Sequence, residues 1–142
     1  MPFDAAQSED TNLLMKLREV RKLIGAGWVK GLSCADQFGN PTMLNDATRF
    51  CLTGAIHRVA VLTDNVSDDC MNIIARAIKP RLSPDVLRVV VSDNRDTIQC
   101  WNDKSGRTHE EVLKLLDHII TVEEMKAKRP KIDCYALLDG RV

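Results

Sequence analysis

Apolar residues recur every three or four positions along much of the chain, and this spacing predicts amphipathic helices. The pattern is plainest over residues 108–128, where the apolar positions are Val112, Leu115, Leu116, Ile119 and Ile120. Thr108 precedes Glu111 by three residues, a spacing that predicts a capping box at the start of the helix. Since Pro130 follows, we expect this helix to end near Lys128.

A similar pattern near the amino terminus predicts a helix with apolar positions at Leu13, Leu14, Leu17, Val20, Leu23 and Ile24. Ser8, Asp10 or Thr11 can cap its first turn, and Gly25 and Gly27 end it. The glycine-punctuated residues 27–43 then predict a long ordered loop or a small hairpin.

The middle of the chain gives less uniform signals. Residues 44–62 predict a second helix, and residues 67–79 predict a third that starts with a serine cap and stops before a proline. Residues 86–91, VLRVVV, are β-branched and fit either a short buried helix or a strand. The preceding Ser-Pro-Asp favours the helix, whereas we expect residues 97–101 to be extended.

These elements predict a single compact, mainly α domain over residues 1–142, with four longer helices and irregular loops that carry the two tryptophans. The chain is 44% hydrophobic, enough for one core, and only 4% aromatic, which suits packed helices better than a β-sandwich. One short β element stays open at residues 86–91. We expect residues 1–9 to be a flexible terminus and residues 130–142 to form an extended tail docked on the core.

Charge and cysteine content narrow the functional class. The 20 basic and 20 acidic residues are intermixed, so the net charge is zero and a nucleic-acid-binding role is disfavoured. The one compact basic run, residues 126–131, suits the negative end of a helix dipole. The first ten residues lack the pattern of a secretory signal, and the five cysteines lack CxxC or zinc-finger spacing. We therefore expect a cytoplasmic protein with reduced thiols, no membrane contact and no cofactor.

The segment that precedes the last long helix is the main candidate site. In a structural interpretation, Asn102 or Asp103 forms an Asx-turn and Trp101 anchors the turn on the core. In a functional interpretation, Trp101 supplies a recognition surface while Asp103 and Arg107 clamp a partner or small ligand. An anionic ligand is the weaker version, because several carboxylates surround this segment. Trp28, in the glycine-rich loop, marks a second place for a site.

Three pieces of sequence resemble a known group. They are GWVKG at 27–31, RFCLTGAI at 49–56, and WND followed by GRTHEEV between 101 and 112. Together they resemble a family of small uncharacterised proteins, a domain of unknown function found in bacteria and their phages, over most of the chain. The resemblance implies no catalytic residues. It implies that a defining feature of the group is formed by Trp101, Asn102, Asp103, Arg107 and Thr108.

Catalytic and metal-binding alternatives have weaker signals. A metal or hydrolytic site would have to gather acidic and histidine residues that show no diagnostic spacing, namely His57, Asp64, Asp68, Asp69, Asp103 and His109. Cys51 and His57 would lie on different faces of one helix, so they do not form a nucleophile–base pair. Cys34 is expected to be the most accessible thiol.

The pattern as a whole favours a small cytosolic, non-enzymatic protein-interaction module with an unknown protein partner. A phage or mobile-element accessory protein that modulates a host process such as defence is consistent with the resemblance. The first alternative is a metal-assisted hydrolase that uses Asp and His residues, and the second is a nucleic-acid-binding protein. Self-association stays open, because a helical domain can pair its apolar faces, but no heptad repeat persists long enough to predict a coiled coil.

Overall fold

The computed structural model describes residues 5–63, 68–90 and 93–129. Within them the α-helices are α1 (Ala5–Ala26), α2 (Leu52–Thr63), α3 (Asp69–Ile78), α4 (Pro84–Val90), α5 (Asn94–Asn102) and α6 (His109–Lys128). Short 3-10 helices η1 (Leu44–Asp46) and η2 (Lys79–Arg81) and strands β1 (Cys34–Ala35) and β2 (Arg49–Phe50) complete the order. The mainly α prediction is confirmed. None of the described helices has the length and apolarity needed to cross a membrane.

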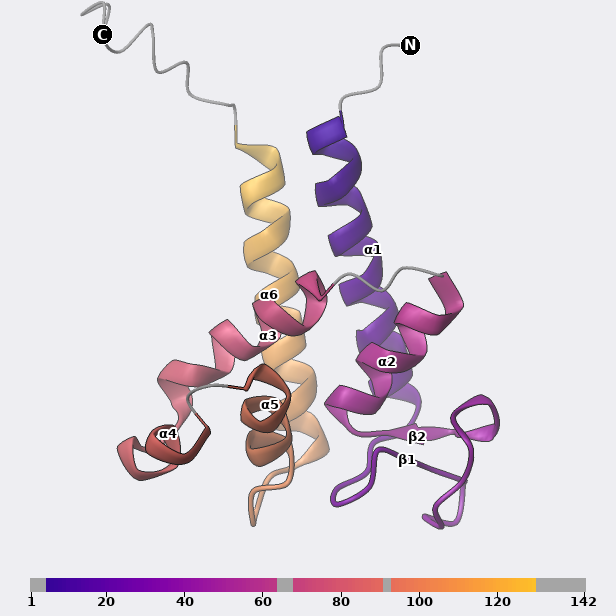
Figure 1. Ribbon diagram of the computed structural model, residues 1–142. Coiled ribbons are helices and arrows are strands. Elements are labelled where there is room, and N and C mark those ends of the chain that lie inside the picture. Colours follow the sequence, from indigo (N-terminus) through magenta and orange to yellow (C-terminus); the bar gives the residue numbers. More distant parts are fainter. Residues whose placement is uncertain (1–4, 64–67, 91–92, 130–142) are drawn as a thin grey trace, which may run out of the picture.

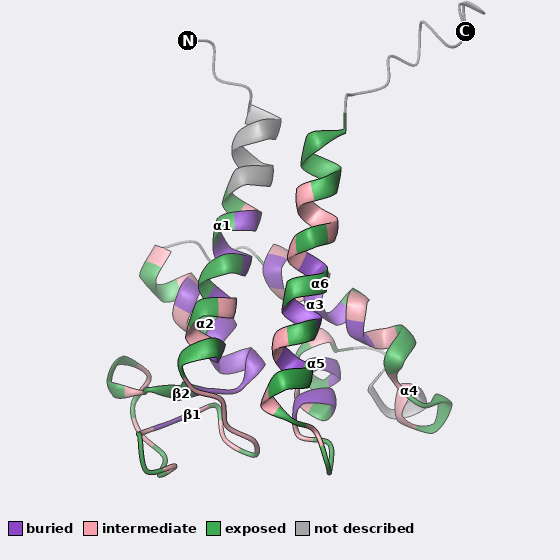
Figure 2. Ribbon diagram, turned by 180° about the vertical axis from the view of Figure 1, so that it is seen from behind, coloured by how far each residue is buried: buried purple, intermediate pink, exposed green. Residues whose placement is uncertain are grey.

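Helices α1 and α6 form an antiparallel pair that runs the height of the molecule (Figure 1). Arg21 pairs with Asp117 at 2.9 Å, and Arg18 pairs with Glu124 at 3.4 Å, which fixes the antiparallel register. Helices α2 and α3 pack on this pair, and α5 packs on α2 and α3. The buried residues belong mainly to α1, α2, α3, α5 and α6 (Figure 2). The fully buried large apolar residues are Leu17, Val20, Ile24, Leu52, Val59, Ile74, Ile78, Ile98, Val112 and Leu116.

The two strands form a small antiparallel ladder with Cys34 opposite Phe50. The ladder packs on the start of α2, where the Gly54 Cα lies so close to the Ser33 carbonyl that an added Cβ would come within 1.9 Å of the oxygen. Only glycine fits at this approach. Residues 27–43 are mostly irregular, as the loop alternative expected, and their one strand, β1, pairs with β2 from beyond this segment.

The helix predicted for residues 44–62 is wrong in its first half, because α2 begins at Leu52. The backbone N–H groups of Thr48, Phe50 and Cys51 donate to the distant carbonyls of Ala35, Gly27 and Ser33. These long-range bonds hold the segment extended and outweigh its helical periodicity. Thr53, in the first turn of α2, is buried although it is polar, and its hydroxyl donates to Gln99 at 2.9 Å.

Two other boundaries differ from prediction. Helix α1 begins at Ala5 and passes through the three expected caps, so residues 5–9 are helical. Residues 97–101 belong to helix α5 and are not extended, because Asp93 Oδ1 accepts from Arg95 N at 2.8 Å and caps that helix.

The remaining helix predictions are confirmed where the structure describes the chain. Thr108 and Glu111 form the reciprocal capping box of α6. VLRVVV is helical up to Val90, and the Ser83 hydroxyl accepts from Val86 N at 3.4 Å at the start of α4. Helix α3 starts at Asp69, but the predicted Ser67 cap lies outside the described residues, as do residues 1–4 and the tail 130–142.

Candidate functional site

Asn102, the last residue of α5, is fully buried and joins three separate segments. Its Oδ1 accepts from Trp28 Nε1 at 2.8 Å and from Leu52 N at 3.2 Å. Its Nδ2 donates to Val29 O at 3.3 Å and to Asp103 Oδ1 at 2.9 Å. An amide side chain offers two acceptor and two donor positions, so all four are used. Asn102 therefore fastens the end of α5 to the α1–β1 loop and to the start of α2.

Asp103 continues this network one residue further. Its Oδ1 also accepts from Gly31 N at 2.9 Å, and its Oδ2 accepts from Gln99 Nε2 at 2.8 Å. Burial acts to raise the pKa of Asp103, but these hydrogen bonds, with the nearby charge of Lys30, outweigh burial and hold that pKa below its ordinary value. Asp103 is thus an ionised acceptor that is already engaged by three donors.

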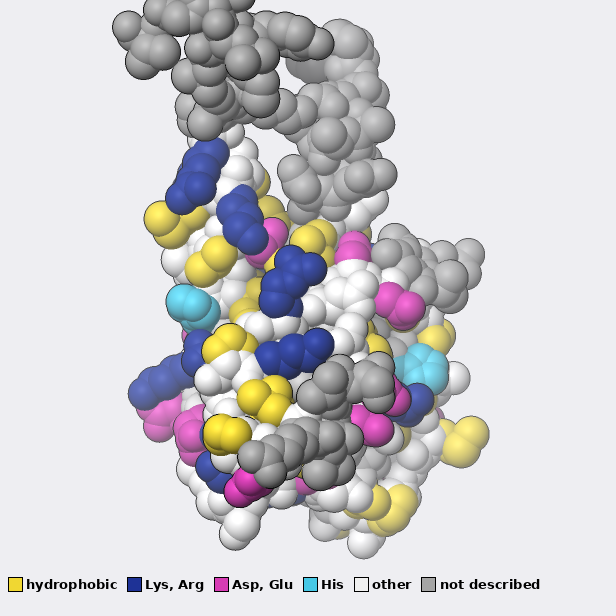
Figure 3. Space-filling view, turned by 60° about the vertical axis from the view of Figure 1, so that its left-hand side comes forward, with side chains coloured by type: hydrophobic (Ala, Val, Ile, Leu, Met, Phe, Trp, Pro, Cys, Tyr) yellow, Lys and Arg dark blue, Asp and Glu magenta, His cyan; other side chains and the backbone are white. Residues whose placement is uncertain are grey.

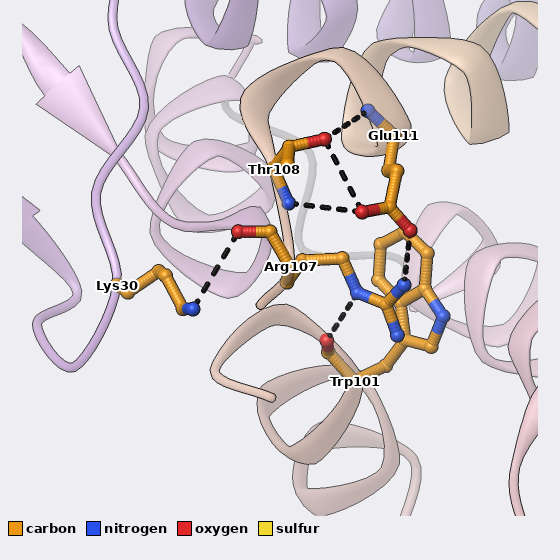
Figure 4. Close-up of polar contacts among 5 residues, drawn as sticks. All are labelled: Lys30, Trp101, Arg107, Thr108 and Glu111. Atoms are coloured by element: carbon orange, nitrogen blue, oxygen red, sulfur yellow. Dashed lines mark hydrogen bonds and ion pairs between the residues drawn. The ribbon is translucent and has the colours of Figure 1, made fainter. Parts of the chain in front are cut away.

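Arg107 links the end of α5 to the start of α6. Its Nε donates to Trp101 O at 2.9 Å, and its guanidinium lies 3.9 Å above the centre of the Trp101 ring, an arrangement that cation–π attraction favours. Its Nη1 donates to Glu111 Oε2 at 2.8 Å (Figure 4). That bond is the main reason why the pKa of Glu111 lies below its ordinary value. Glu111 Oε1 meanwhile accepts from Thr108 N at 3.2 Å.

Trp28, which donates to Asn102, also contacts the start of α6. Its indole ring stacks on His109 with ring centres 5.9 Å apart and an angle of 17° between the planes. His109 Nε2 lies 2.6 Å from Ile24 O, and because a carbonyl can only accept, Nε2 carries the proton of this bond. The stack joins the end of α1 to the first turn of α6.

The five residues predicted for a site, Trp28, Trp101, Asn102, Asp103 and Arg107, therefore come together. The turn predicted at Trp101 and Asn102 is wrong, because both residues belong to the last turn of helix α5. Asn102 and Asp103 do bond backbone N–H groups, but those of Leu52 and Gly31 in distant segments, not those of a local Asx-turn. Trp101 is buried against the core, as the structural interpretation expected.

A groove of about 660 Å³ opens beside this network, between α5 and the η2–α4 segment. A second hollow of about 260 Å³ adjoins it above the start of α6, and the two share Arg81, Trp101, Lys104 and Arg107. Of the predicted residues, Trp101, Asp103 and Arg107 line the larger groove, whereas Trp28 and Asn102 do not.

The groove also brings in residues that the sequence interpretation did not single out, chiefly Arg81, Leu82, Val86, Cys100 and Lys104. The sequence carries a signal for Arg81 alone: residues 76–81, RAIKPR, have three basic residues and no acidic one. The prediction that Cys34 is the most accessible thiol is wrong for the described cysteines, since Cys34 is half-buried and Cys100 is exposed.

The residues considered for catalysis do not converge where the structure describes them, and Asp64 lies outside the described residues. Among the residues that the structure describes, no three His, Cys, Asp or Glu side chains lie close enough to hold a metal ion. Asp69 pairs with buried Lys16, and Cys51 is buried while His57 is exposed. Burial raises the pKa of the Cys70 thiol to about 12, which keeps it protonated.

Comparison with known proteins gives a family and no activity. A family model described as a family of unknown function (DUF6197) matches residues 8–122. No curated protein and no solved structure matches the chain.

Asn102→Ala should lower the free energy of unfolding by about 2–4 kcal/mol, because it leaves the Trp28 indole N–H and the Leu52 N–H without their acceptor. Urea unfolding followed by circular dichroism measures the change. Asn45→Ala is the matched control, since the exposed Asn45 side chain accepts from Arg58 and has no other described side-chain partner, and it should stay within about 0.5 kcal/mol of wild type. Equal losses in both variants would contradict this role of Asn102.

The lowered pKa of Asp103 predicts a pH dependence of stability. An unfolded aspartate has a pKa of about 3.9, and the folded pKa lies lower, so the stabilisation is fully present above the unfolded pKa and is lost as the pH falls through the folded pKa. Asp103→Asn should therefore cost about 1 kcal/mol near neutral pH, with the gap to wild type closing on acidification. Urea unfolding at a series of pH values measures this gap, and a gap that widens towards acid would show that Asp103 is destabilised as an anion.

Proposed function

The chain belongs to this family of unknown function, and we propose that it is a cytosolic, non-enzymatic module that binds a protein partner in the groove between η2–α4 and α5. The observation that carries the proposal is the groove itself: its apolar surface comes chiefly from Leu82, Val86 and Cys100, and its rim carries exposed charges. An apolar centre within a polar rim is the usual composition of a protein interface.

The state of the polar groups in the groove favours binding over catalysis. A general base works best when its pKa lies near the working pH, whereas the hydrogen bonds of Asp103 hold its pKa below the ordinary value. Gln99 is likewise engaged, because it donates to Asp103 and accepts from Thr53. These groups serve to fix the wall of the groove. A stoichiometric binder of this kind would suit a phage or mobile-element accessory protein acting on a host process such as defence, as the sequence resemblance suggests.

Charge reversal at the rim should abolish binding without unfolding the protein. Arg81 and Lys104 are both exposed, so Arg81→Glu combined with Lys104→Glu should change the free energy of unfolding by no more than about 0.5 kcal/mol. A photo-crosslinking amino acid placed at Cys100, in the groove, should capture a specific partner from a lysate of the host, and the double variant should lose it. Mass spectrometry identifies the crosslinked protein.

The same crosslinker placed at Lys22, exposed on α1 and outside the described grooves, is the positional control. Lys22→Glu is the control for charge reversal and should leave the Cys100 crosslink intact. Equal crosslinks from both positions, or none from Cys100, would contradict a binding site in the groove.

A further inference from the structure

We propose that the groove binds an acidic segment of its protein partner, in which carboxylates flank an apolar side chain. This inference rests on the proposed function and adds the chemistry of the partner. The first support is the charge of the rim: Arg81 ends η2 on one wall, and Lys104 follows α5 on the other. Within the described part of the chain neither side chain forms an ion pair, so both positive charges are available to a partner.

The acidic residues of the groove oppose such a partner less than the sequence suggests. The Asp103 carboxylate is held by donors from Gly31, Asn102 and Gln99. In the adjoining hollow, Glu111 is bonded by Arg107 and by the capping Thr108. The positive charge of Arg107 compensates the negative charge of Glu111 and reduces the repulsion of an anionic partner there. The donors to Asp103 are uncharged, so they engage its oxygens but leave its negative charge in place. Asp96 is the remaining acidic residue among the described lining.

The wall of the groove suits the apolar side chain that the proposed partner segment carries between its own carboxylates. Trp101 lies beneath Arg107, and Leu82, Val86 and Cys100 add apolar surface. At about 660 Å³ the groove falls in the size range of pockets that enclose small ligands, so it has room for one or two side chains of a peptide. Burial of an apolar side chain there supplies affinity, while the rim charges select the partner.

The basic surface continues beyond the groove. Arg76 and Lys79 precede Arg81 along α3 and η2, and neither forms an ion pair with a described residue. Figure 3 shows Lys and Arg side chains following one another down one face, with hydrophobic side chains between them. A peptide that alternates acidic and apolar residues could therefore contact this surface as well as the groove.

The aromatic content of the groove favours a peptide over single-stranded nucleic acid. Sequence-independent binding of single strands relies on exposed aromatic rings on which bases stack. Trp101 is the one aromatic residue among the described lining residues, and it is 4% exposed with Arg107 over its ring. A base therefore has no open ring face in the groove.

Selection from a displayed library of random 12-residue peptides tests the proposal on the full chain. Selected peptides should be rich in Asp and Glu around an apolar residue. Synthetic copies should bind about tenfold or more weakly to Arg81→Glu/Lys104→Glu than to wild type or Lys22→Glu, and more weakly as salt is added. Isothermal titration calorimetry measures these affinities.

A charge exchange makes the test sharper. Copies of the selected peptide with Lys in place of Glu should lose binding to wild type and recover it with the double variant. Selection of neutral or basic peptides, no selection at all, or affinities that ignore the two substitutions would overturn the proposal. The proposal would also be overturned if no acidic peptide binds, whereas a poly-dT oligonucleotide binds to wild type and not to the double variant. A partner crosslinked at Cys100 through a segment without acidic residues would overturn this inference and leave the proposed function standing.

Discussion

The arrangement of the molecule depends on one buried amide. Asn102 has no exposed surface, and each of its four hydrogen-bonding positions has a partner from a different residue. A buried polar network of this kind stabilises a structure only when every group in it is paired, because an unpaired group loses its bonds to water without replacement. The same requirement leaves little freedom in how α5 meets the α1–β1 loop and α2. No described buried side-chain N or O atom lacks a partner.

The hydrogen-bond network of Asn102 also positions residues of the groove. Asp103 and Arg107 are bonded on one side to the Asn102 network and to Trp101 O, and on the other they line the groove. Their positions are therefore set by the interior, whereas the side chains of Arg81 and Lys104 lie on the rim and form no ion pair with a described residue. Structural and functional interpretations of the Trp-Asn-Asp motif thus do not exclude each other. Asn102 holds the fold together, and Trp101 and Asp103 also form part of one wall of the proposed binding surface.

The sequence predicts correctly those features that depend on interactions between residues close together in the chain. The capping box of Thr108 and Glu111 and the apolar stripe of α6 are set within a few residues, and both were predicted correctly. Residues 44–51 also have helical periodicity, but their backbone pairs with Ala35, Gly27 and Ser33, which no local pattern reveals. The convergence of Trp28 on Asn102, 74 positions away, is likewise a tertiary result. Val86 belongs to no motif, and the basic run that contains Arg81 does not indicate a site by itself. These residues become a site only when η2 and α4 lie beside α5.

Hydrogen exchange measured by NMR tests the central claim, that the Asn102–Asp103 network is a single joint. Three of its N–H groups can be followed separately: the Trp28 indole and the backbone amides of Leu52 and Gly31. If the network opens as a unit, all three should exchange slowly and share one free energy of opening. Three unrelated free energies, or a Trp28 indole that exchanges as fast as a free one, would contradict the account.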